Sequence, residues 1–476
     1  MNMKRRFFFG LLTPGRIIFI LILIYIALLT VPYLRHKKVS ENFQNDFSQR
    51  EFYSSQAGSE RIAYINDNTD ALLYRLQMIE QAEQEIILST FDFNADKGGK
   101  DVMAALMSAA DRGVKVRVII DGFSGFLDVK GKGTQWFQAL ASHENISLRI
   151  YNPLTPLKPW TMQARLHDKY LIIDHQMFLL GGRNTTNLFL GDYSKSKNID
   201  REIFVYETED NKASSLYQLK AYFEKIWALK NSREFTCKKL SDEIQECIAS
   251  LNNRYQKLKE TYPKAYTDWD FQKLTFETNK ISLLCNPLEA ENKEPWMWYS
   301  IHQLMLQGKE TLIYTPYIIC GKEMYQDLTD LKDNNIPLEI ITNDVASGAN
   351  PWGCTDYLNQ KEKIWKTGAK VYEFMGGHSC HTKAVLIDDR MSIVGSYNLD
   401  MRSTYQDTEL MLAIDSEKLN SMIRKEAETD KTYSKTMGPD GNYIQGENYV
   451  PKKLSTGKKI FYWTLRVLTV PLRKFL

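Results

Sequence analysis

One pattern of five residues occurs twice in this chain, and it constrains the fold more than any other feature. The two copies are LHDKYLIIDHQMFLLGGRN (residues 166–184) and CHTKAVLIDDRMSIVGSYN (residues 380–398). In both, a His is followed by Lys two residues later, Asp seven later, Gly fourteen later and Asn seventeen later. A single His-x-Lys pair arises easily by chance. Two matched sets, 214 residues apart, predict two related halves.

The segments before each copy repeat one order of expected elements. Hydrophobic periodicity predicts a buried strand, an amphipathic helix and a second strand at 84–93, 100–113 and 114–121, and again at 310–319, 323–335 and 336–344. The stretches 170–174 and 384–388 are predicted as further strands, each followed by a turn and a hairpin partner. Because side chains alternate along a strand, the His and Lys of each copy point to the same side.

Length and patterning together predict five regions. At 476 residues the chain suits two domains with additional segments. We expect an N-terminal membrane anchor (1–38), a first α/β domain (39–210), a helical connector (211–275), a second α/β domain (276–420) and a basic amphipathic, membrane-associated segment (421–476).

Both ends of the chain suggest membrane contact. The apolar run 17–34 would reach about 27 Å as a helix, close to the thickness of a bilayer's hydrocarbon layer. A retained anchor is the favoured interpretation, and a cleaved signal peptide is the alternative. Four Lys or Arg residues on each side leave its orientation open under the positive-inside rule. After Glu447 the chain has seven Lys or Arg, no acidic residue and interleaved apolar side chains, which predicts a helix in the membrane interface. The alternative is a helix packed on the body or a frayed tail.

Charge and cysteine usage argue against two classes of partner. Between residues 39 and 447 the chain has 47 basic and 58 acidic residues. Proteins that grip nucleic acid normally present a basic surface, so we expect no nucleic-acid partner. The six Cys form no C-x-x-C and no cluster with His, so we expect no metal and no other cofactor.

The paired motifs suit the transfer of a phosphodiester. Its negative charge requires cationic and hydrogen-bonding groups on the phosphate oxygens. The candidates are Lys169, Lys383, Asn184 and Asn398. One imidazole, of His167 or His381, would attack phosphorus, and the other would exchange protons with the leaving and incoming alcohols.

Carboxylates complete the candidate set. A carboxylate bonded to the far ring nitrogen of a histidine fixes its tautomer and basicity, and Glu202 and Glu409, which follow the two Asn residues, are the candidates. Asp174 and Asp388 stay among the candidate catalytic residues because they belong to the repeated pattern. A turn or packing role in the hairpins is the favoured interpretation for both.

These features resemble the phospholipase D superfamily, whose signature H-x-K-x4-D-x6-G-x-x-N occurs here twice. The resemblance covers most of residues 60–415. GGRN after the first copy, GSYNLDMRS and DTEL after the second, AADRGVKVRVIID upstream and the apolar N-terminus resemble bacterial cardiolipin synthases. The resemblance implies a pseudo-twofold pair of α/β/α sandwich domains with an N-terminal transmembrane helix and one active site between the domains.

The resemblance also implies roles and a reaction. His167 would be the nucleophile that forms a covalent phosphatidyl-histidine, His381 would be the general acid and base, and Ser396 would join the phosphate-binding residues. The implied enzyme joins two phosphatidylglycerol molecules and releases glycerol at the plasma membrane of a bacterium.

Three other functions stay open. A phospholipase D-type hydrolase would use the same residues and pass the intermediate to water. A phosphodiesterase acting on nucleic acid fits the motifs but not the acidic body. A membrane-tethered scaffold with a vestigial site conflicts with complete sets in both halves.

Overall fold

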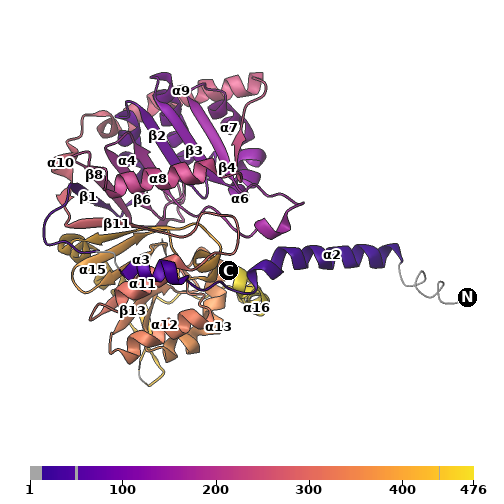
Figure 1. Ribbon diagram of the computed structural model, residues 1–476, viewed down its shortest axis with the longest axis vertical. Coiled ribbons are helices and arrows are strands. Elements are labelled where there is room, and N and C mark those ends of the chain that lie inside the picture. Colours follow the sequence, from indigo (N-terminus) through magenta and orange to yellow (C-terminus); the bar gives the residue numbers. More distant parts are fainter. Residues whose placement is uncertain (1–12, 49–51, 439) are drawn as a thin grey trace, which may run out of the picture.

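The computed structural model describes residues 13–48, 52–438 and 440–476. They form two stacked α/β domains and an N-terminal helix that extends away from them (Figure 1). The cationic residues before position 13, which entered the orientation argument, lie outside the described residues.

A nine-stranded mixed sheet forms the centre of the first domain. Its strands in spatial order are β10 (Phe276–Glu277), β1 (Glu60–Ile65), β8 (Glu202–Glu207), β6 (Met177–Gly181), β5 (Tyr170–Ile173), β2 (Glu85–Thr90), β3 (Lys115–Asp121), β4 (Ile146–Tyr151) and β9 (Ser232–Phe235). Within it, β2, β3 and β4 run parallel, and the other neighbours are antiparallel. The main helices are α4 (Asn68–Glu80), α5 (Lys97–Asp111), α7 (Thr134–Ala141), α8 (Ser215–Ala228) and α9 (Asp242–Thr261).

The second domain repeats this sheet. Its strands in spatial order are β11 (Lys280–Cys285), β18 (Leu410–Asp415), β17 (Met391–Gly395), β16 (Ala384–Ile387), β12 (Thr311–Tyr314), β13 (Leu338–Asn343), β14 (Lys370–Phe374), β19 (Ser434–Met437) and β20 (Tyr443–Gln445). Its main helices are α11 (Trp296–Met305), α12 (Lys322–Asp333), α13 (Pro351–Lys366), α14 (Met401–Tyr405) and α15 (Glu417–Thr432). The order β1-β8-β6-β5-β2-β3-β4-β9 corresponds strand for strand to β11-β18-β17-β16-β12-β13-β14-β19. The expected pseudo-twofold pair of α/β/α domains is therefore present.

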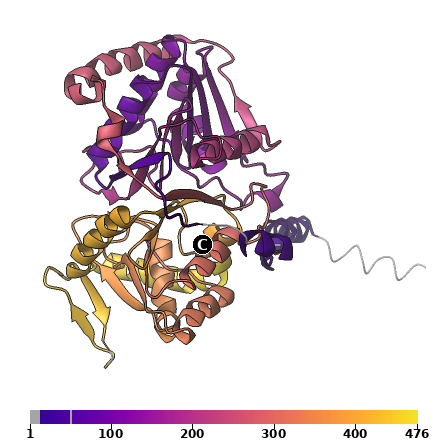
Figure 2. The same ribbon diagram turned by 60° about the vertical axis from the view of Figure 1, so that its left-hand side comes forward.

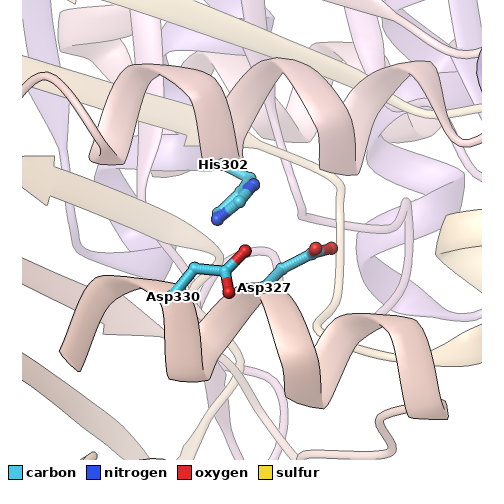
Figure 3. Close-up of side chains that lie close together, drawn as sticks. All are labelled: His302, Asp327 and Asp330. Atoms are coloured by element: carbon cyan, nitrogen blue, oxygen red, sulfur yellow. The ribbon is translucent and has the colours of Figure 1, made fainter. Parts of the chain in front are cut away.

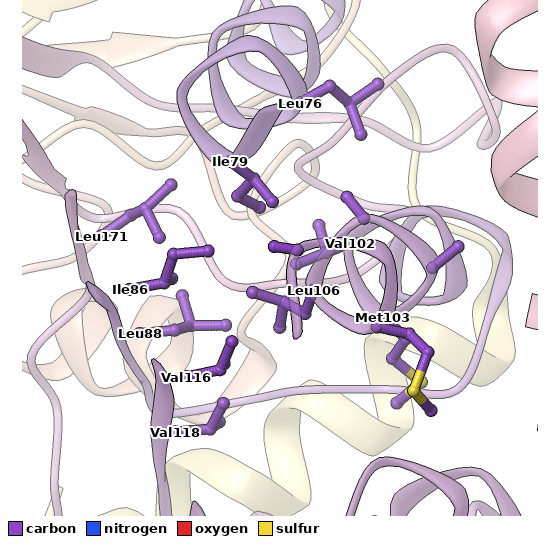
Figure 4. Packing of buried hydrophobic residues seen from close by; sticks show 14 of the residues in the cluster. Leu76, Ile79, Ile86, Leu88, Val102, Met103, Leu106, Val116, Val118 and Leu171 are labelled. Carbon is purple, nitrogen blue, oxygen red and sulfur yellow. The ribbon is translucent and has the colours of Figure 1, made fainter. Parts of the chain in front are cut away.

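Three apolar cores hold the layers together. One lies between the first sheet and its outer helices, where apolar side chains of β2 and β3 pack against α4 and α5 (Figure 4). A second lies between the second sheet and α11, α12 and α13. The third combines the inner faces of both sheets with α8 and α15, so the two domains share one core. This shared core fixes the domains against each other, because buried apolar surface is lost if they separate.

The domain boundaries differ from those expected. Residues 211–275, expected as a connector, belong to the first domain, because α8 lines the shared core, β9 extends the sheet and α9 packs on α5 and α7. The stretch 421–437, expected in the C-terminal membrane segment, completes α15 and adds β19 to the second sheet. Helix α3 (Glu41–Ser48), expected in the first domain, begins a segment whose Phe47 and Phe52 pack into the core of the second. Charged, helix-periodic segments do not reveal which sheet they cover.

The C-terminal segment lies next to the inner end of the N-terminal helix, beside the second domain. Helix α2 (Pro14–Thr30) and the short η1 (Val31–Tyr33) form one helix that is apolar and long enough to cross a membrane. Its most apolar stretch is not buried against the rest of the protein. At the other end, α16 (Thr456–Leu472) lies along α13. Lys474 Nζ donates to the carbonyl oxygen of Leu34 at 2.6 Å. Figure 1 shows α16 beside the base of α2, and Figure 2 shows α2 projecting from the body between the two domains.

Candidate active site

Backbone pairing between the domains brings the two motifs together. Strand β7 (Asn198–Ile199) of the first half pairs in parallel with β15 (Ser379–Cys380) of the second. Leu166 forms a matching bridge with Thr408. Each pairing lies next to a motif histidine, since β15 ends just before His381 and Leu166 precedes His167. The histidines therefore both lie where the two halves meet.

The first histidine is bound by a carboxylate of the second half. His167 Nδ1 lies 2.9 Å from Glu409 Oε1, and the backbone N–H of His167 donates to Thr408 Oγ1 at 3.2 Å. The Glu409 side chain is fully buried, and its second oxygen accepts a hydrogen bond from the hydroxyl of Ser396. This contact places Glu409 where a carboxylate would fix the tautomer of His167 with Nε2 free.

The second histidine is bound by a carboxylate of the first half. His381 Nδ1 lies 2.6 Å from Asp200 Oδ2, and the backbone N–H of His381 donates to Ile199 O at 2.8 Å. Lys383 Nζ lies 3.4 Å from the same carboxylate oxygen. The two His–carboxylate pairs are thus exchanged between the domains, and neither half holds a complete pair alone.

Asp200 and Glu409 occupy equivalent places in the two halves. In the strand register Gly181 faces Glu202 and Gly395 faces Met411, so each carboxylate lies two residues before the partner of its motif glycine. The residues after those glycines differ, because Gly182 stands where the second half has Ser396. A Cβ at Gly182 would lie 2.3 Å from Asp200 Oδ2, so no side chain fits there. Ser396 contacts Glu409, and its expected role on phosphate stays a prediction.

Glu202 is not beside a histidine, which corrects the prediction that it orients one. Its two oxygens pair with Arg75 at 2.6 and 2.9 Å, and Arg183 lies 3.3 Å away. Both arginines are buried, and the ion pairs tie β8 to α4 inside the first domain. The difference arises because Glu202 begins β8 and pairs with α4, whereas Asp200 precedes the strand and reaches His381 of the second half.

Burial and the paired lysines set the protonation of the site. Burial lowers the pKa of Lys169 to about 7, with Glu409 opposing the change. Burial and then Lys383 lower the pKa of His381 to about 3, and burial and then Lys169 hold the pKa of His167 well below its usual value. Lys169 also lowers the pKa of His381, and Lys383 that of His167. The four groups therefore share one electrostatic environment, with both imidazoles neutral at pH 7.

The two carboxylates differ in protonation. Burial raises the pKa of Glu409 to about 7, against the opposing charge of Lys169 and the hydrogen bond from Ser396. Burial acts on Asp200 in the same direction, but Lys383 and His381 together hold its pKa below the usual value. Asp200 is thus ionised at pH 7, whereas Glu409 is near its midpoint.

The motif asparagines lie at the same interface with free hydrogen-bonding capacity. Within the described residues, the side-chain oxygens of Asn184 and Asn398 are buried without a hydrogen-bond partner. Asn398 Nδ2 donates to the Tyr317 hydroxyl at 3.3 Å. An amide oxygen only accepts, so the donors that a phosphate requires would come from the amide nitrogens of these residues and from the two lysines.

Asp174 and Asp388 lie away from the histidines, which corrects their place among the catalytic candidates. Both follow the far ends of the motif strands, at φ of 52° and 50°, in the left-handed region that Asp tolerates better than most residues. Asp174 accepts backbone N–H groups of Glu83, Gln84 and Glu85, and Asp388 accepts those of Lys309 and Glu310. The four residues of β5 lie between Lys169 and Asp174, and the five residue steps span about 17 Å. They close turns, as the favoured interpretation held.

Three groups of this site are not among the residues predicted from the sequence. Asp200 stands two residues before the predicted Glu202, and only the strand register distinguishes them. The rings of Phe91 and Phe189 pack edge-on against His167 and His381, with centroids 5.4 and 4.8 Å apart. Phe91 lies within the stretch predicted as a strand (84–93) and directly follows the observed β2, but nothing in the sequence marks Phe189.

Comparison with known proteins finds relatives that match about three quarters of the chain. The family model described as "Cardiolipin synthase, PLD-like domain" matches residues 76–227 and 301–431, which include both motifs. Cardiolipin synthase C of Escherichia coli (strain K12) is 24% identical over 400 residues, covering 76% of this chain and 82% of that protein. Minor cardiolipin synthase ClsB of Bacillus subtilis (strain 168) is 23% identical over 383 residues, covering 79% and 82%.

A solved structure shares the fold. The crystal structure of phosphatidylserine synthase from Haemophilus influenzae Rd KW20 superposes with a TM-score of 0.63 at 15% identity, covering 92% of this chain and 99% of that one. The residues matched by the family model make up more than half of the chain. The chain belongs to the cardiolipin synthase family of phospholipase D-like proteins.

Proposed function

We propose that this protein is a membrane-bound phosphatidyltransferase that joins two phosphatidylglycerol molecules into cardiolipin and releases glycerol. The observation that carries the proposal is the pair of interface histidines, each bonded through Nδ1 to a buried carboxylate of the opposite half. Neither carboxylate uses the Nε2 atom of its histidine, and Nε2 of His381 lies 3.1 Å from Lys383 Nζ. We propose that both Nε2 atoms act on one phosphorus. The similarity to two cardiolipin synthases supports the choice of lipid substrate.

In the first step, Nε2 of His167 attacks the phosphorus of one phosphatidylglycerol. The P–N bond forms as the P–O bond to the headgroup glycerol breaks, and His381 gives its Nε2 proton to the departing oxygen. His381 is neutral in the free protein, with its pKa lowered to about 3. The anionic phosphodiester opposes the charges of Lys169 and Lys383, which raises that pKa as substrate binds.

In the second step, the headgroup hydroxyl of another phosphatidylglycerol attacks the phosphatidyl-histidine. His381 takes the hydroxyl proton, the new P–O bond forms and the P–N bond to His167 breaks. Lys169, Lys383, Asn184 and Asn398 hold the phosphate oxygens through both steps. Glu409 stabilises the charge that develops on the His167 ring while the P–N bond exists.

The surface around the chain ends supports a lipid substrate. Leu465 and Thr469 of α16 are buried against the body, whereas Trp463 on the same helix is 68% exposed. Further exposed apolar side chains of α16 are Ile460, Phe461, Val467, Leu468 and Val470. We propose that α16 lies in the membrane interface beside the α2 anchor, with its basic residues near lipid phosphates.

The anchor also adjoins the loop that leads to the first motif. The hydroxyl of Tyr33 donates to the carbonyl oxygen of Trp160 at 2.8 Å, and α2 packs on η3 (Pro159–Thr161). In this loop Leu157 is 87% exposed. Only a few residues separate the loop from His167. An α2 that spans the bilayer would therefore hold the active site near the headgroups.

Product analysis tests the proposed reaction. The purified full chain, reconstituted with phosphatidylglycerol vesicles, should form cardiolipin and glycerol in equal amounts, as measured by lipid mass spectrometry. Phosphatidic acid with glycerol, and no cardiolipin, would instead assign a hydrolase. His167→Ala and His381→Ala should each abolish turnover. The matched control is His143→Gln, which changes a histidine of the first domain outside the site. Wild-type turnover in either folded alanine variant would refute the paired-histidine scheme.

A two-substrate assay tests the role of α16. Replacing Ile460 and Trp463 together by Glu should lower turnover on vesicles and leave turnover on micellar short-chain phosphatidylglycerol unchanged, because only vesicles require the interface. Equal losses on both substrates would contradict membrane contact by this helix.

A further inference from the structure

Three ligand-type side chains converge on the outer side of the second domain, away from the paired histidines. They are His302 of α11 and Asp327 and Asp330 of α12, and one ligand atom from each lies within 4.8 Å of those of the other two. Figure 3 shows the imidazole of His302 pointing from one helix toward the two carboxylates on the other. Asp327 and Asp330 are three residues apart, so they lie on one face of α12.

Among the described residues, the Nε2 atom of the buried His302 imidazole has no hydrogen-bond partner. His302 is only 6% exposed. A buried ring nitrogen normally has one. An unpartnered imidazole nitrogen beside two carboxylates is the arrangement that a metal ion completes.

The carboxylate of Asp327 already has an outer partner. The indole N–H of Trp298 donates to Asp327 Oδ2 at 2.6 Å, which leaves the other oxygen for a ligand. Metal-binding carboxylates and imidazoles are commonly held in this way by a second hydrogen bond. Trp298 also stacks on His302, with ring centroids 6.3 Å apart. One residue thus positions two of the three groups.

We propose that His302, Asp327 and Asp330 bind one divalent transition-metal ion of the Zn²⁺ or Mn²⁺ type, with water completing its coordination. One imidazole with two carboxylates suits these ions better than Mg²⁺ or Ca²⁺, which favour oxygen ligands alone. Ligand atoms around tetrahedral Zn²⁺ lie about 3.3 Å apart, so modest side-chain rotations close the present spacing. The expectation of no metal rests on cysteine spacing, whereas these ligands lie on two separate helices and include no cysteine.

The site would act on the fold and not on phosphorus. A bound ion links α11 to α12 across the outer layer of the second domain. Trp298 also stacks on Tyr397, with centroids 6.4 Å apart, and Tyr397 directly precedes the motif residue Asn398. Metal binding would therefore stabilise the layer behind the phosphate-binding residues. This inference does not depend on the proposed reaction.

Metal binding to the full chain tests the proposal. Protein purified in detergent and stripped with EDTA should take up one Zn²⁺ per chain by elemental analysis after dialysis, and its Tm should rise when Zn²⁺ is added. Co²⁺ should bind in the same place and give visible absorption typical of nitrogen and oxygen ligands. Absence of stoichiometric uptake, or uptake without a change in Tm, would overturn the site.

Variants separate this site from adventitious binding. His302→Gln and the half-buried Asp330→Asn should each weaken Zn²⁺ binding at least ~100-fold, and Trp298→Phe should weaken it roughly tenfold through the lost outer hydrogen bond. Asp333→Asn, an exposed position on the same helix, should bind like the wild type. Because Asp330 is only half-buried, its variant should fold even if His302→Gln does not. Unchanged uptake in folded Asp330→Asn would assign the metal elsewhere and refute the proposal.

Discussion

Asp200→Asn tests the exchange of carboxylates between the domains. The wild-type carboxylate accepts a hydrogen bond from His381 at 2.6 Å and lies 3.4 Å from Lys383 Nζ. The Asp200 side chain is fully buried, and Gly182 packs so closely against it that a Cβ at position 182 would clash with the Asp200 carboxylate. The amide keeps the shape and removes the negative charge.

The expected loss of activity follows from the hydrogen bond to a charged group. Such a bond contributes about 1.5–3 kcal/mol, which corresponds to a roughly 10- to 150-fold lower kcat if it acts on the protonated His381 of the transition state. Stability should fall too, because a buried cation left without its partner costs about 3–5 kcal/mol. Lys383 limits that cost by releasing its proton, since burial already lowers its pKa.

The pH dependence carries a definite sign. The folded pKa of Asp200 lies below its unfolded value, so its contribution to stability is present above about pH 4 and disappears as pH falls through the folded pKa. The part of the difference in free energy of unfolding between wild type and Asp200→Asn that comes from the Asp200 charge should therefore shrink in acid below about pH 4.

Glu409→Gln provides the comparison in the other half. Its folded pKa of about 7 exceeds the unfolded value, so its contribution to stability is full below about pH 4 and is lost as pH rises through 7. At pH 7, Glu409→Gln should thus lose less free energy of unfolding than Asp200→Asn. Above pH 7 the stability of Glu409→Gln should rise relative to that of the wild type. Asp210→Asn, at an exposed pair with Lys212, is the matched control.

The assay is initial-rate turnover of phosphatidylglycerol in mixed micelles, with Tm measured on the same samples from pH 3 to 9. Activity of folded Asp200→Asn within threefold of the wild type would refute the role of the exchanged carboxylate. An equal loss of stability in both variants would refute the assigned difference in protonation.

Other changes separate catalytic from structural groups. Burial lowers the pKa of Lys169 to about 7, so kcat/KM should fall as pH rises through 7. In Lys169→Arg this fall in kcat/KM should move above pH 9. A fall that stays near pH 7 in the variant would assign the titration to another group. Asp174→Ala should lower the free energy of unfolding by about 2 kcal/mol in denaturant titration, because turn hydrogen bonds are lost and Ala tolerates the left-handed φ poorly. The kcat of the folded variant should be unchanged. A selective loss of kcat would return Asp174 to the catalytic residues. Glu202→Gln should cost about 3–5 kcal/mol by leaving Arg75 and Arg183 uncompensated, and should not alter the pH profile of the folded enzyme; a shifted profile would contradict its structural role.

The strands could be predicted because each is a short apolar run next to a repeated motif. The stretch predicted at 114–121 is β3 (Lys115–Asp121), and the predicted hairpin is β5 paired with β6. Which sheet a helix covers could not be predicted as well from the sequence. The charge and helical periodicity of residues 211–275 fit a connector between domains as well as helices packed on the first sheet. Only the apolar residues of α8 in the shared core decide between them.

The carboxylate partners could be predicted in kind but not in place. Glu409 was identified because it follows the second Asn, yet its partner is the histidine of the other half. Sequence order suggests pairing within a half, whereas the β7–β15 pairing exchanges the carboxylates between domains. Glu202 looked equivalent to Glu409 by residue type, but the strand register gives that place to Asp200.

Trapping the covalent intermediate tests the central claim most directly. Denaturing the wild-type protein within milliseconds of mixing with phosphatidylglycerol should trap a phosphatidyl adduct on His167, located by mass spectrometry of the digested protein. His381→Ala lacks the general acid of the first step and should form this adduct far more slowly. His167→Ala under the same conditions should carry none. An adduct on another residue, or turnover by either variant, would contradict catalysis by two histidines joined across the domain interface.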